Sequence, residues 1–403
     1  MHTKPFKVRH PATVLTATAL LVAVTSAPAH AGPPAAQCGD TVTSDLSLSS
    51  DLHCNGPGFV VKAGDVVLNL NGHSITGSGT GTGISVIDQA RVHVRNGRIS
   101  HFDRGVLFVG SIDSELVDLS LTDNSGHNVQ TAESSTNFKL TDCKIRRGDV
   151  EIDTTSGLTA THSEFSQAGI QFNLTSRSSN ISGSTFVDSP IGYWTNANNG
   201  SLTGNTLIRS GVSLREADNL TVSGNTFKQG YVRVLNASRN TTITDNRFSD
   251  GDRAVFVQQA LSSSNLRIVR NRFTGNQIGV DASDVFVGME DGITVSGNTF
   301  TDNAVAGILL DSPAAHSPYW VRIERNVLKS NGKSSGGRVD SAGRPVDDGI
   351  HVNVPANSPV EITGNITRAN ADYGIEAVPG SVTDGGGNVS HGDPSGCLGV
   401  FCA

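Results

Sequence analysis

Two aspartates in the second half of the chain end short apolar segments of the same form, Ile278-Gly-Val-Asp281 and Ile308-Leu-Leu-Asp311. If these segments are neighbouring strands, the two carboxylates lie about 5 Å apart. Carboxylates that close cannot both ionise freely, so one pKa rises and the pair divides into an acid and a base. The spacing therefore predicts a catalytic pair, supported by Asp348 and His351 in the next such segment.

The elements that would hold these residues come from a repeated phrase: an alternating strand, a small polar residue, one spacer, and then Phe or Leu. One clear example is Val222-Ser-Gly-Asn225-Thr-Phe227. The polar position is occupied in turn by Asn96, Leu119, Cys143, Ser163, Ser184, Asn205, Asn225, Asn246, Asn271, Asn298, Asn326, Asn365 and Asn388. The repeat distance lies in the low twenties up to Asn246, and such a period built from short strands predicts a β-solenoid.

Stacking stabilises such a repeat, because one coil of about 20 residues cannot bury its own apolar side chains. Each added coil lengthens the solenoid by about 4.8 Å. An Asn at the same place in successive coils can hydrogen-bond to the Asn above and below it. The Phe or Leu two residues later has the same parity, so we expect it to stack inside. The chain is thus predicted to be all-β, with one solenoid domain of about 14 coils over residues 60–390.

Each repeat also contains a second short strand of the form Gly-Ile-x-Val, such as residues 349–352. Because strand side chains alternate, the apolar residues point inward and those between them point outward. The outward residues include Trp194, Arg215, Arg233 and Asn353. Aromatic rings can stack on sugars, while charged and amide groups can bond hydroxyl or acid groups. We predict these four residues to be substrate contacts; a merely solvated strand face is the alternative.

Long loops in the last third of the chain point to the same face. The intervals between repeats lengthen after Asn246, at residues 282–291, 312–320 and 328–347. Long loops on a rigid scaffold often carry function, so we expect these three to form walls beside the second strand. The middle loop contains Tyr319 and Trp320, which we predict to be sugar platforms. A tolerated insertion is the alternative for the last loop, which is rich in Gly and Ser.

The repeats resemble those of the right-handed parallel β-helix family, which includes pectate lyases and polygalacturonases. The likeness covers about residues 60–390, and the early phrase Asn71-Gly-His-Ser-Ile75 is similar to the start of many secreted bacterial members. The resemblance implies that the second strand of each coil lines a substrate groove, and so that the protein acts on a polysaccharide. Asp347-Asp348 looks like the aspartate pair that begins a groove strand in polygalacturonases.

The reaction stays open at this stage. The Asn-Thr-Asp, Gly-His-Gly and Arg-Ile-Lys phrases of polygalacturonases are missing at matching places. Hydrolysis would use the Asp281 and Asp311 pair. Elimination would use Arg215 and Arg233 to neutralise a uronate, with Ca²⁺ held by the two aspartates. A glycan-binding module without catalysis and a passive cell-surface spacer are the non-enzymatic alternatives, and a fold alone does not decide among them.

The two ends of the chain differ from the repeats. Residues 1–31 combine a basic start, an apolar run and Ala29-His-Ala31, which predicts a signal peptide and a secreted protein. Residues 32–60 are predicted to form a linker and cap, and residues 391–403 a stapled tail. We pair Cys38 with Cys54 and Cys397 with Cys402, one bridge at each end of the solenoid. The remaining cysteine, Cys143, occupies the Asn position and should be a buried, inert thiol.

Composition narrows the possible partners. The formal net charge of the whole chain is −7. Loss of the three basic residues in the predicted signal peptide would make it more negative still. An acidic surface argues against nucleic acid and against anionic membranes. We expect a monomer that is not inserted in a membrane, with a polysaccharide or cell-wall glycan as its partner. No cofactor is predicted with certainty.

Overall fold

The computed structural model describes residues 1–2, 35–236, 238–258, 265–284, 292–312, 320–356 and 358–403. The chain divides into residues 1–35 and residues 36–403, and every strand belongs to the second unit. The predicted signal peptide lies almost wholly outside the described residues and remains a prediction. Within the described ranges, no helix is long and apolar enough to cross a membrane.

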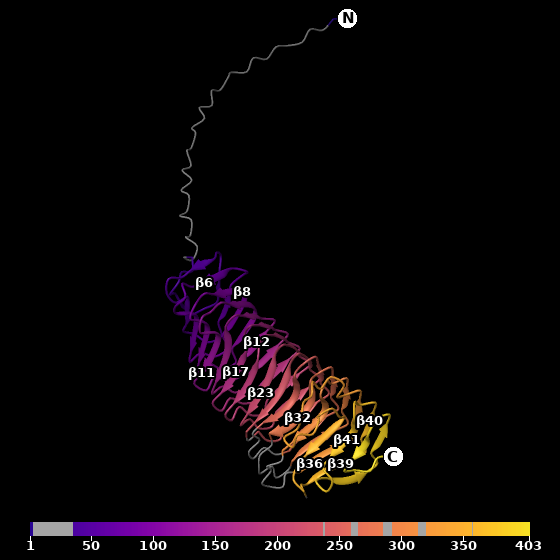
Figure 1. Ribbon diagram of the computed structural model, residues 1–403. Helices are drawn as coiled ribbons and strands as arrows, with labels where there is room; N and C mark the ends of the chain where they lie inside the picture. Colours follow the sequence, from indigo (N-terminus) through magenta and orange to yellow (C-terminus); the bar gives the residue numbers. More distant parts are fainter. Residues whose placement is uncertain (3–34, 237, 259–264, 285–291, 313–319, 357) are drawn as a thin grey trace. The chain divides into compact units, whose positions relative to one another are not determined.

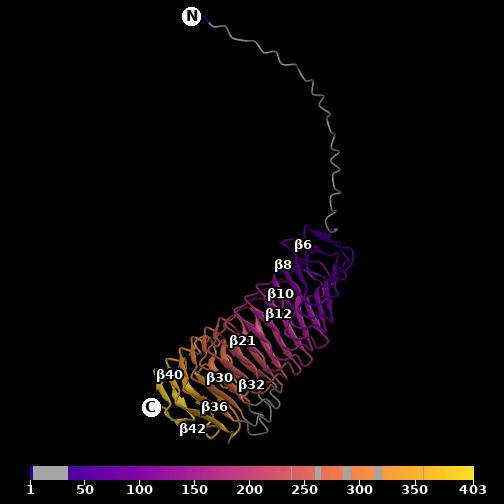
Figure 2. The same ribbon diagram turned by 180° about the vertical axis from the view of Figure 1, so that it is seen from behind.

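The second unit is a parallel β-solenoid, as predicted, with about 15 coils where about 14 were expected. Figures 1 and 2 show the coils following one another in sequence order. One sheet, called sheet A here, contains sixteen strands. They are, in order, β1 (Thr41–Val42), β4 (Phe59–Val61), β7 (Thr82–Ile87), β9 (Arg104–Val109), β11 (His127–Ala132), β14 (Asp149–Asp153), β17 (Ile170–Asn173), β20 (Ile191–Trp194), β23 (Gly211–Arg215), β26 (Tyr231–Leu235), β29 (Arg253–Gln258), β32 (Ile278–Asp284), β35 (Ala306–Asp311), β38 (Ile350–Asn353), β41 (Tyr373–Ala377) and β44 (Gly396–Leu398).

The remaining strands form two ranks, called sheet B here, that meet at the repeated Asn position. The first rank contains β2 (Leu46–Ser47), β5 (Val67–Asn69), β12 (Lys139–Thr141), β15 (Thr159–Thr161), β18 (Asn180–Ser182), β21 (Ser201–Thr203), β24 (Thr221–Ser223), β27 (Thr242–Thr244), β30 (Leu266–Val269), β33 (Ile293–Ser296), β36 (Val321–Glu324), β39 (Val360–Thr363) and β42 (Thr383–Gly386). The second contains β3 (Leu52–His53), β6 (Ser74–Thr76), β13 (Lys144–Arg146), β16 (Glu164–Ser166), β19 (Thr185–Val187), β22 (Thr206–Ile208), β25 (Thr226–Lys228), β28 (Arg247–Ser249), β31 (Arg272–Thr274), β34 (Thr299–Thr301), β37 (Val327–Lys329), β40 (Ile366–Arg368) and β43 (Val389–His391). Strands β8 (His93–Ser100) and β10 (Glu115–Thr122) run through both ranks. The first three strands already pair with the next coil, so the solenoid includes part of the predicted cap.

The predicted Asn ladder is confirmed from Asn205 to Asn388. At each step the Oδ1 atom of one Asn accepts hydrogen bonds from the backbone N–H and the Nδ2 group of the Asn one coil earlier. For Asn205 and Asn225 these distances are 2.8 and 3.0 Å. The ladder gives buried polar groups in the turn their partners. Asn96 does not belong to it, because Gly97 takes the matching place opposite Leu119.

A second ladder was not predicted from the sequence. Each of its members lies five residues after a member of the first ladder. It consists of Asn276, Asn303, Asn331, Asn370 and finally Asp393. Between the ladders the predicted aromatic stack is present, with the rings of Phe227, Phe248, Phe273 and Phe300 lying 4.5–5.1 Å apart between neighbours. These buried stacks and ladders fix the alignment of each coil on the next.

The cysteine predictions are confirmed. Cys38 is bonded to Cys54, and Cys397 is bonded to Cys402. Disulfides of this kind fit an oxidising compartment. Cys143 is a free, buried thiol, and its burial raises its pKa to about 11, so it stays protonated at neutral pH.

Candidate functional site

The register of sheet A separates the two aspartates that the sequence pairs. The register of β32 places Asp281 opposite Phe256 on one side and Leu309 on the other. Asp311 lies opposite Asn353 instead. The expectation that Asp281 and Asp311 share one row on neighbouring strands is therefore wrong, because Val280 aligns with Ile308, which puts Asp281 beside Leu309 and two residues short of Asp311. Their catalytic roles are not tested by this geometry and remain predictions.

Asp281 is a buried carboxylate at the edge of the arginine-rich part of sheet A. Its Oδ1 atom accepts hydrogen bonds from the backbone N–H of Ser283 at 3.0 Å and from the Ser283 hydroxyl at 2.5 Å. Its Oδ2 atom lies 3.4 Å from Nη1 of Arg253. Only 3 % of the Asp281 side chain is exposed, so Arg253 rather than solvent neutralises it.

Asp311 binds a loop rather than facing open solvent. The loop, residues 330–349, follows β37 and is called the insert here. Asp311 accepts hydrogen bonds from the backbone N–H of Ser341 at 2.8 Å and from its hydroxyl at 2.5 Å. The amide of Asn353 donates to the same carboxylate at 2.7 Å. The insert therefore crosses the outer face of β35 and β38, where walls beside that face were expected.

A small apolar cluster fastens the insert to sheet A. Val346 of the insert is buried together with Leu309, whose side chain points outward from β35. Ile278, Val305 and Ala306 complete the cluster. The cluster removes apolar surface from water on the outer side of the sheet, separately from the main core. The outer face of the last coils is therefore partly covered by the protein itself.

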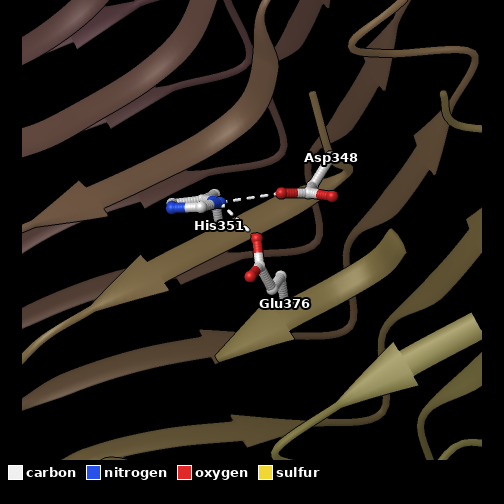
Figure 3. Close-up of side chains that lie close together, drawn as sticks. All are labelled: Asp348, His351 and Glu376. Atoms are coloured by element: carbon white, nitrogen blue, oxygen red, sulfur yellow. Dashed lines mark hydrogen bonds and ion pairs between the residues drawn. The ribbon is translucent and has the colours of Figure 1, made fainter. Parts of the chain in front are cut away.

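Five charged residues, called the cage here, gather where the insert meets sheet A, and all but Arg344 are buried: Asp340, Arg344 and Asp348 of the insert, His351 of β38 and Glu376 of β41. Figure 3 shows Asp348 and Glu376 pointing at the same ring nitrogen of His351. The Nδ1 atom lies 2.7 Å from Oδ2 of Asp348 and 2.9 Å from Oε2 of Glu376. The other ring nitrogen, Nε2, lies 3.1 Å from Oδ2 of Asp340. The side chain of His351 has no exposed surface.

The remaining contacts of the cage tie it to the insert and to β41. Arg344 approaches Oδ2 of Asp340 with Nη2 at 2.7 Å and Nε at 2.9 Å. Its Nη1 atom lies 3.4 Å from Oε1 of Glu376. The backbone N–H of Tyr373 donates to Oδ1 of Asp348 at 2.9 Å. Asp348 and His351 were predicted as supporting catalytic residues, and the structure brings them together, but in a buried position at the end of the insert.

Burial and neighbouring charge shift several pKa values in the cage. Burial works against protonation of His351, but the hydrogen bond and charge of Asp348, with Asp340 and Glu376, raise its pKa overall. Burial, together with the charge of Asp348, raises the pKa of Glu376 to about 7. For Asp340 burial is outweighed by the backbone N–H of Arg344 and by His351, and the pKa is lowered.

Two groups of side chains could hold a metal ion, judged over the described residues. Asp348, His351 and Glu376 offer one ligand atom each within 4.8 Å of one another, and all three are buried. Asp347 and Asp372 form a second, less buried group with Asp348. Burial raises the pKa of Asp347, with further contributions from the charges of Asp348 and Asp372. Asp281 and Asp311, the predicted Ca²⁺ ligands, stand on neighbouring strands but not opposite each other.

Earlier coils of sheet A carry a different set of side chains, called the arginine–aromatic face here. Its members are Trp194, Arg215, Tyr231, Arg233, Arg253 and Phe256. They come from four consecutive strands of sheet A, β20, β23, β26 and β29. Half of the Arg215 side chain is exposed, and the other five residues are half-buried. Four neighbouring strands span about 14 Å along the solenoid.

Two rings of this face lie flat against the sheet. A Cβ on Gly192 would meet Nε1 of Trp194 at 2.3 Å, and the Trp194 indole N–H donates to Gln171 at 2.7 Å. A Cβ on Gly211 would meet the Tyr231 ring at 2.3 Å. Glycine at these two positions therefore leaves the space that the rings occupy. A flat ring of this kind presents its face outward, the geometry in which a sugar ring can stack.

The guanidinium groups surround the third ring. The central carbons of Arg233 and Arg253 lie 5.3 and 4.8 Å from the centre of the Phe256 ring. Arg233 also donates to the side-chain oxygen of Gln258. Its Nε atom is buried and has no hydrogen-bond partner among the described residues. A buried donor without a partner is unusual in a folded protein.

Three of these residues were predicted as substrate contacts, namely Trp194, Arg215 and Arg233. The other three, Tyr231, Arg253 and Phe256, were not. The alternation of β26 and β29 carried the signal for Tyr231 and Phe256, which stand between buried residues, but not for Arg253, which begins β29. Asn353 lies under the insert, away from the other predicted contacts. Trp320 is 52 % exposed, with Arg322 at 5.9 Å from its ring, and stands in the approach to β36. Tyr319 lies outside the described residues.

The repeats match the profile of the right handed beta helix region over residues 47–207, 150–284 and 210–388. The chain belongs to the right-handed β-helix family. This assignment confirms the resemblance seen in the repeats and leaves the reaction open, because the fold hosts many functions. A search among curated proteins finds no match.

Several solved structures share this fold at low similarity. The complex of alginate lyase AlyF-OU02 with G6 is 9 % identical, with a TM-score of 0.46 over 82 % of this chain and 80 % of that one. A mannuronic acid specific polysaccharide family 6 lyase enzyme from human gut microbiota is 10 % identical, with a TM-score of 0.45 over 82 % and 81 %. The periplasmic alginate epimerase AlgG is 12 % identical, with a TM-score of 0.31 over 80 % and 78 %. At this level of similarity the matches bear on neither substrate nor reaction.

Proposed function

We propose that this protein binds an acidic polysaccharide along the arginine–aromatic face. The observation that supports this most is the placement of Arg233 and Arg253 around the Phe256 ring on two neighbouring strands. An aromatic ring with cationic groups on either side offers stacking for a sugar ring and charge for its acid group. An idle solvated strand face needs neither arrangement.

The sign of the charge favours an acidic ligand over a neutral one. Arg215, Arg233 and Arg253 gather on one face of a chain whose formal net charge is −7. Arginine binds carboxylates and sulfates through two parallel hydrogen bonds, which a neutral sugar cannot accept in the same way. Uronic acid units, each with one carboxylate, match this set of donors.

The spread of the contacts favours binding of a chain rather than of a single sugar. Trp194 stands on β20 and Phe256 on β29, three inter-strand spacings or about 14 Å apart along the solenoid. Tyr231 lies between these ends, and its ring, like that of Trp194, lies flat on the sheet. A linear polymer running along the solenoid axis would meet a ring or a guanidinium at each coil.

Cleavage by elimination is the second candidate, favoured by the contact between Arg253 and Asp281. Elimination from a uronate needs a base beside a cation that neutralises the sugar carboxylate. Arg253 would be that cation and Asp281 that base, and the two lie in contact on neighbouring strands. Hydrolysis by Asp281 and Asp311 receives less support, since the two residues stand in different rows.

A panel of matched polymers tests the proposal. Binding of full-length chain to polygalacturonate, alginate and a neutral glucan should be measured by affinity electrophoresis at low and high salt. We expect retardation by the acidic polymers only, weakened by salt because exposed charges are screened. Equal retardation by the neutral glucan, or none by any polymer, would contradict the proposal.

The same samples distinguish binding from cleavage. Ultraviolet absorbance of an unsaturated product would identify elimination, and new reducing ends without that absorbance would identify hydrolysis. Each assay should be run with and without Ca²⁺, because Ca²⁺ is a possible participant only in elimination. Binding without either product leaves the protein as a glycan-binding module. Secretion, predicted from residues 1–31, is consistent with an extracellular polymer as the ligand.

A further inference from the structure

The cage lies apart from the arginine–aromatic face and has no part in the function proposed above. His351 stands on β38, Glu376 on β41 in the next coil along, and Asp340 and Asp348 on the insert that precedes β38. The side chains of Asp340 and His351 have no exposed surface, and 9 % of Glu376 is exposed. A polymer outside the protein does not reach these groups, so their arrangement calls for a different explanation.

The cage has more acceptors than His351 can satisfy. An imidazole has two ring nitrogens and can offer one N–H from each. Nε2 faces Asp340, while Nδ1 faces both Asp348 and Glu376. One N–H cannot lie along two directions at once, so one of these two buried carboxylates lacks its hydrogen. Arg344 reaches only the other oxygen of Glu376, Oε1, at 3.4 Å, so the buried oxygen that lacks a hydrogen requires either a bound proton or a cation of its own.

The surroundings are those of a metal-ligating histidine. In such sites one ring nitrogen binds the ion and the other donates its hydrogen to a carboxylate, which fixes the tautomer. Asp340 stands at Nε2 in that way, and Arg344 holds Asp340 through two contacts. Asp348 is oriented in turn by the backbone N–H of Tyr373 on its other oxygen. Nδ1, Oδ2 of Asp348 and Oε2 of Glu376 then converge on one point.

We propose that the cage binds one divalent transition-metal ion through Nδ1 of His351, Oδ2 of Asp348 and Oε2 of Glu376. A mixed nitrogen and oxygen set suits Zn²⁺ or Mn²⁺. It does not suit Ca²⁺, which takes six to eight oxygen ligands. The ion would join β38 to β41 and, through Asp340, fasten the insert across sheet A. The site is structural, because it is closed to a substrate.

The full-length chain tests this after treatment with a chelator and dialysis. Zn²⁺, Mn²⁺ or Ca²⁺ is then added singly, and bound metal per chain is measured together with thermal unfolding. We expect about one Zn²⁺ or Mn²⁺ per chain and a melting temperature that rises with its concentration, since a ligand of the folded state stabilises it. Ca²⁺ should leave the melting temperature unchanged. Wild-type protein that takes up neither transition metal would overturn the proposal.

The variant Glu376→Gln distinguishes the two explanations of the cage, a bound metal ion and a bound proton. The amide keeps the size of the side chain but is a poor ligand, so metal uptake and the metal-dependent rise in melting temperature should be lost. Glu361→Gln, which removes a carboxylate that contacts Arg322 on sheet B, is the matched control and should retain both. Metal uptake that survives Glu376→Gln but is lost in Asp372→Asn would place the ion at the neighbouring acidic group and overturn the assignment.

A spectroscopic readout does not depend on the stability of any variant. Wild-type protein loaded with Co²⁺ should show a visible absorption band of a nitrogen- and oxygen-ligated ion. The absence of that band from protein that has taken up Co²⁺ would also overturn the assignment to His351.

Discussion

The guanidinium carbon of Arg253 lies 4.8 Å from the centre of the Phe256 ring, and Nη1 of the same group lies 3.4 Å from Asp281. Arg253 therefore connects the half-buried ring to a buried carboxylate one coil further on. This contact holds the guanidinium in place before any ligand arrives, and a group already in position loses little entropy on binding. The binding face is thus built into the sheet rather than assembled from loops.

Replacing Arg253 should weaken binding without unfolding the protein. Arg253→Gln removes the charge and the stack on Phe256, and we expect the dissociation constant for an acidic oligosaccharide to rise about tenfold. Arg253→Lys keeps the charge but loses the planar fork, so it should restore only part of the affinity. Calorimetric titration measures both. Full affinity in Arg253→Gln would show that the ligand binds elsewhere.

A second prediction concerns the flat rings and uses a variant in which every proposed contact residue is unchanged. Gly211→Ala puts a methyl group where the Tyr231 ring lies, so the ring must lift from the sheet. Loss of one stacking platform should weaken binding about fivefold. Gly56→Ala is the control, because a Cβ there meets nothing within 4 Å. Equal affinity in the two variants would remove Tyr231 from the binding face.

The Asn ladder predicts a large effect on stability. Asn246→Ala leaves the backbone N–H and the Nδ2 group of Asn225 without their shared acceptor, which lies 2.9 and 3.0 Å away. Two buried donors without partners should lower the free energy of unfolding by about 2–4 kcal/mol. Asn246→Ser should cost less, because Ser184 already accepts such a bond from Ser163 in this ladder position. Urea unfolding measures the free energy of unfolding of both variants. A smaller loss in Asn246→Ala than in Asn246→Ser would contradict the role of the ladder.

The cage predicts how stability changes with pH in the chelated, metal-free protein. The pKa of Glu376 is raised to about 7 and that of His351 is also raised, so the folded state holds protons that the unfolded state releases. Both groups stabilise the fold at low pH and lose that contribution as the pH rises. Glu376 loses it between its unfolded pKa and about pH 7. His351 loses it above its unfolded pKa. Urea midpoints should therefore fall from about pH 5.5 to pH 8.

Glu376→Gln supplies the comparison for this pH prediction. The variant lacks the titrating carboxylate, so its urea midpoint should fall less steeply over the same range. Parallel pH curves for wild type and Glu376→Gln would show that Glu376 ionises in the folded state as it does in the unfolded chain. The pKa of Asp340 is lowered, so this carboxylate stabilises the fold near neutral pH and loses that contribution only as the solution becomes acidic.

Local periodicity made the solenoid predictable, while the alignment of β32 on β35 was predicted wrongly. The Asn ladder and the Phe stack follow from a short repeated phrase, and the structure confirms both. The prediction aligned the two segments by the aspartates that end them, whereas the sheet pairs Val280 with Ile308. Asp281 therefore lies opposite Leu309 and outside the row of Asp311.

Long-range contacts were the other limit. The length and composition of the insert identify it as a long loop, but not the surface that it covers. Asp340 meets His351 only because Val346 packs on Leu309 and Ser341 binds Asp311. These contacts join parts of the chain that share no repeat, so periodicity carries no information about them. Phe256 was readable from alternation, but the contacts of Arg233 with its ring and of Arg253 with Asp281 needed the register of β26, β29 and β32.

Affinity of full-length protein for a linear polyuronate fragment, compared between two double variants, tests the central claim most directly. Arg233→Gln/Arg253→Gln removes two charges from the arginine–aromatic face. Arg247→Gln/Arg272→Gln removes two from exposed positions of β28 and β31 in sheet B, so the net charge is the same. We predict that the first double variant loses most of its affinity while the second keeps that of wild type, measured by calorimetry at fixed salt. Equal loss in both, or none in the first, would contradict an acidic-polysaccharide site on this face.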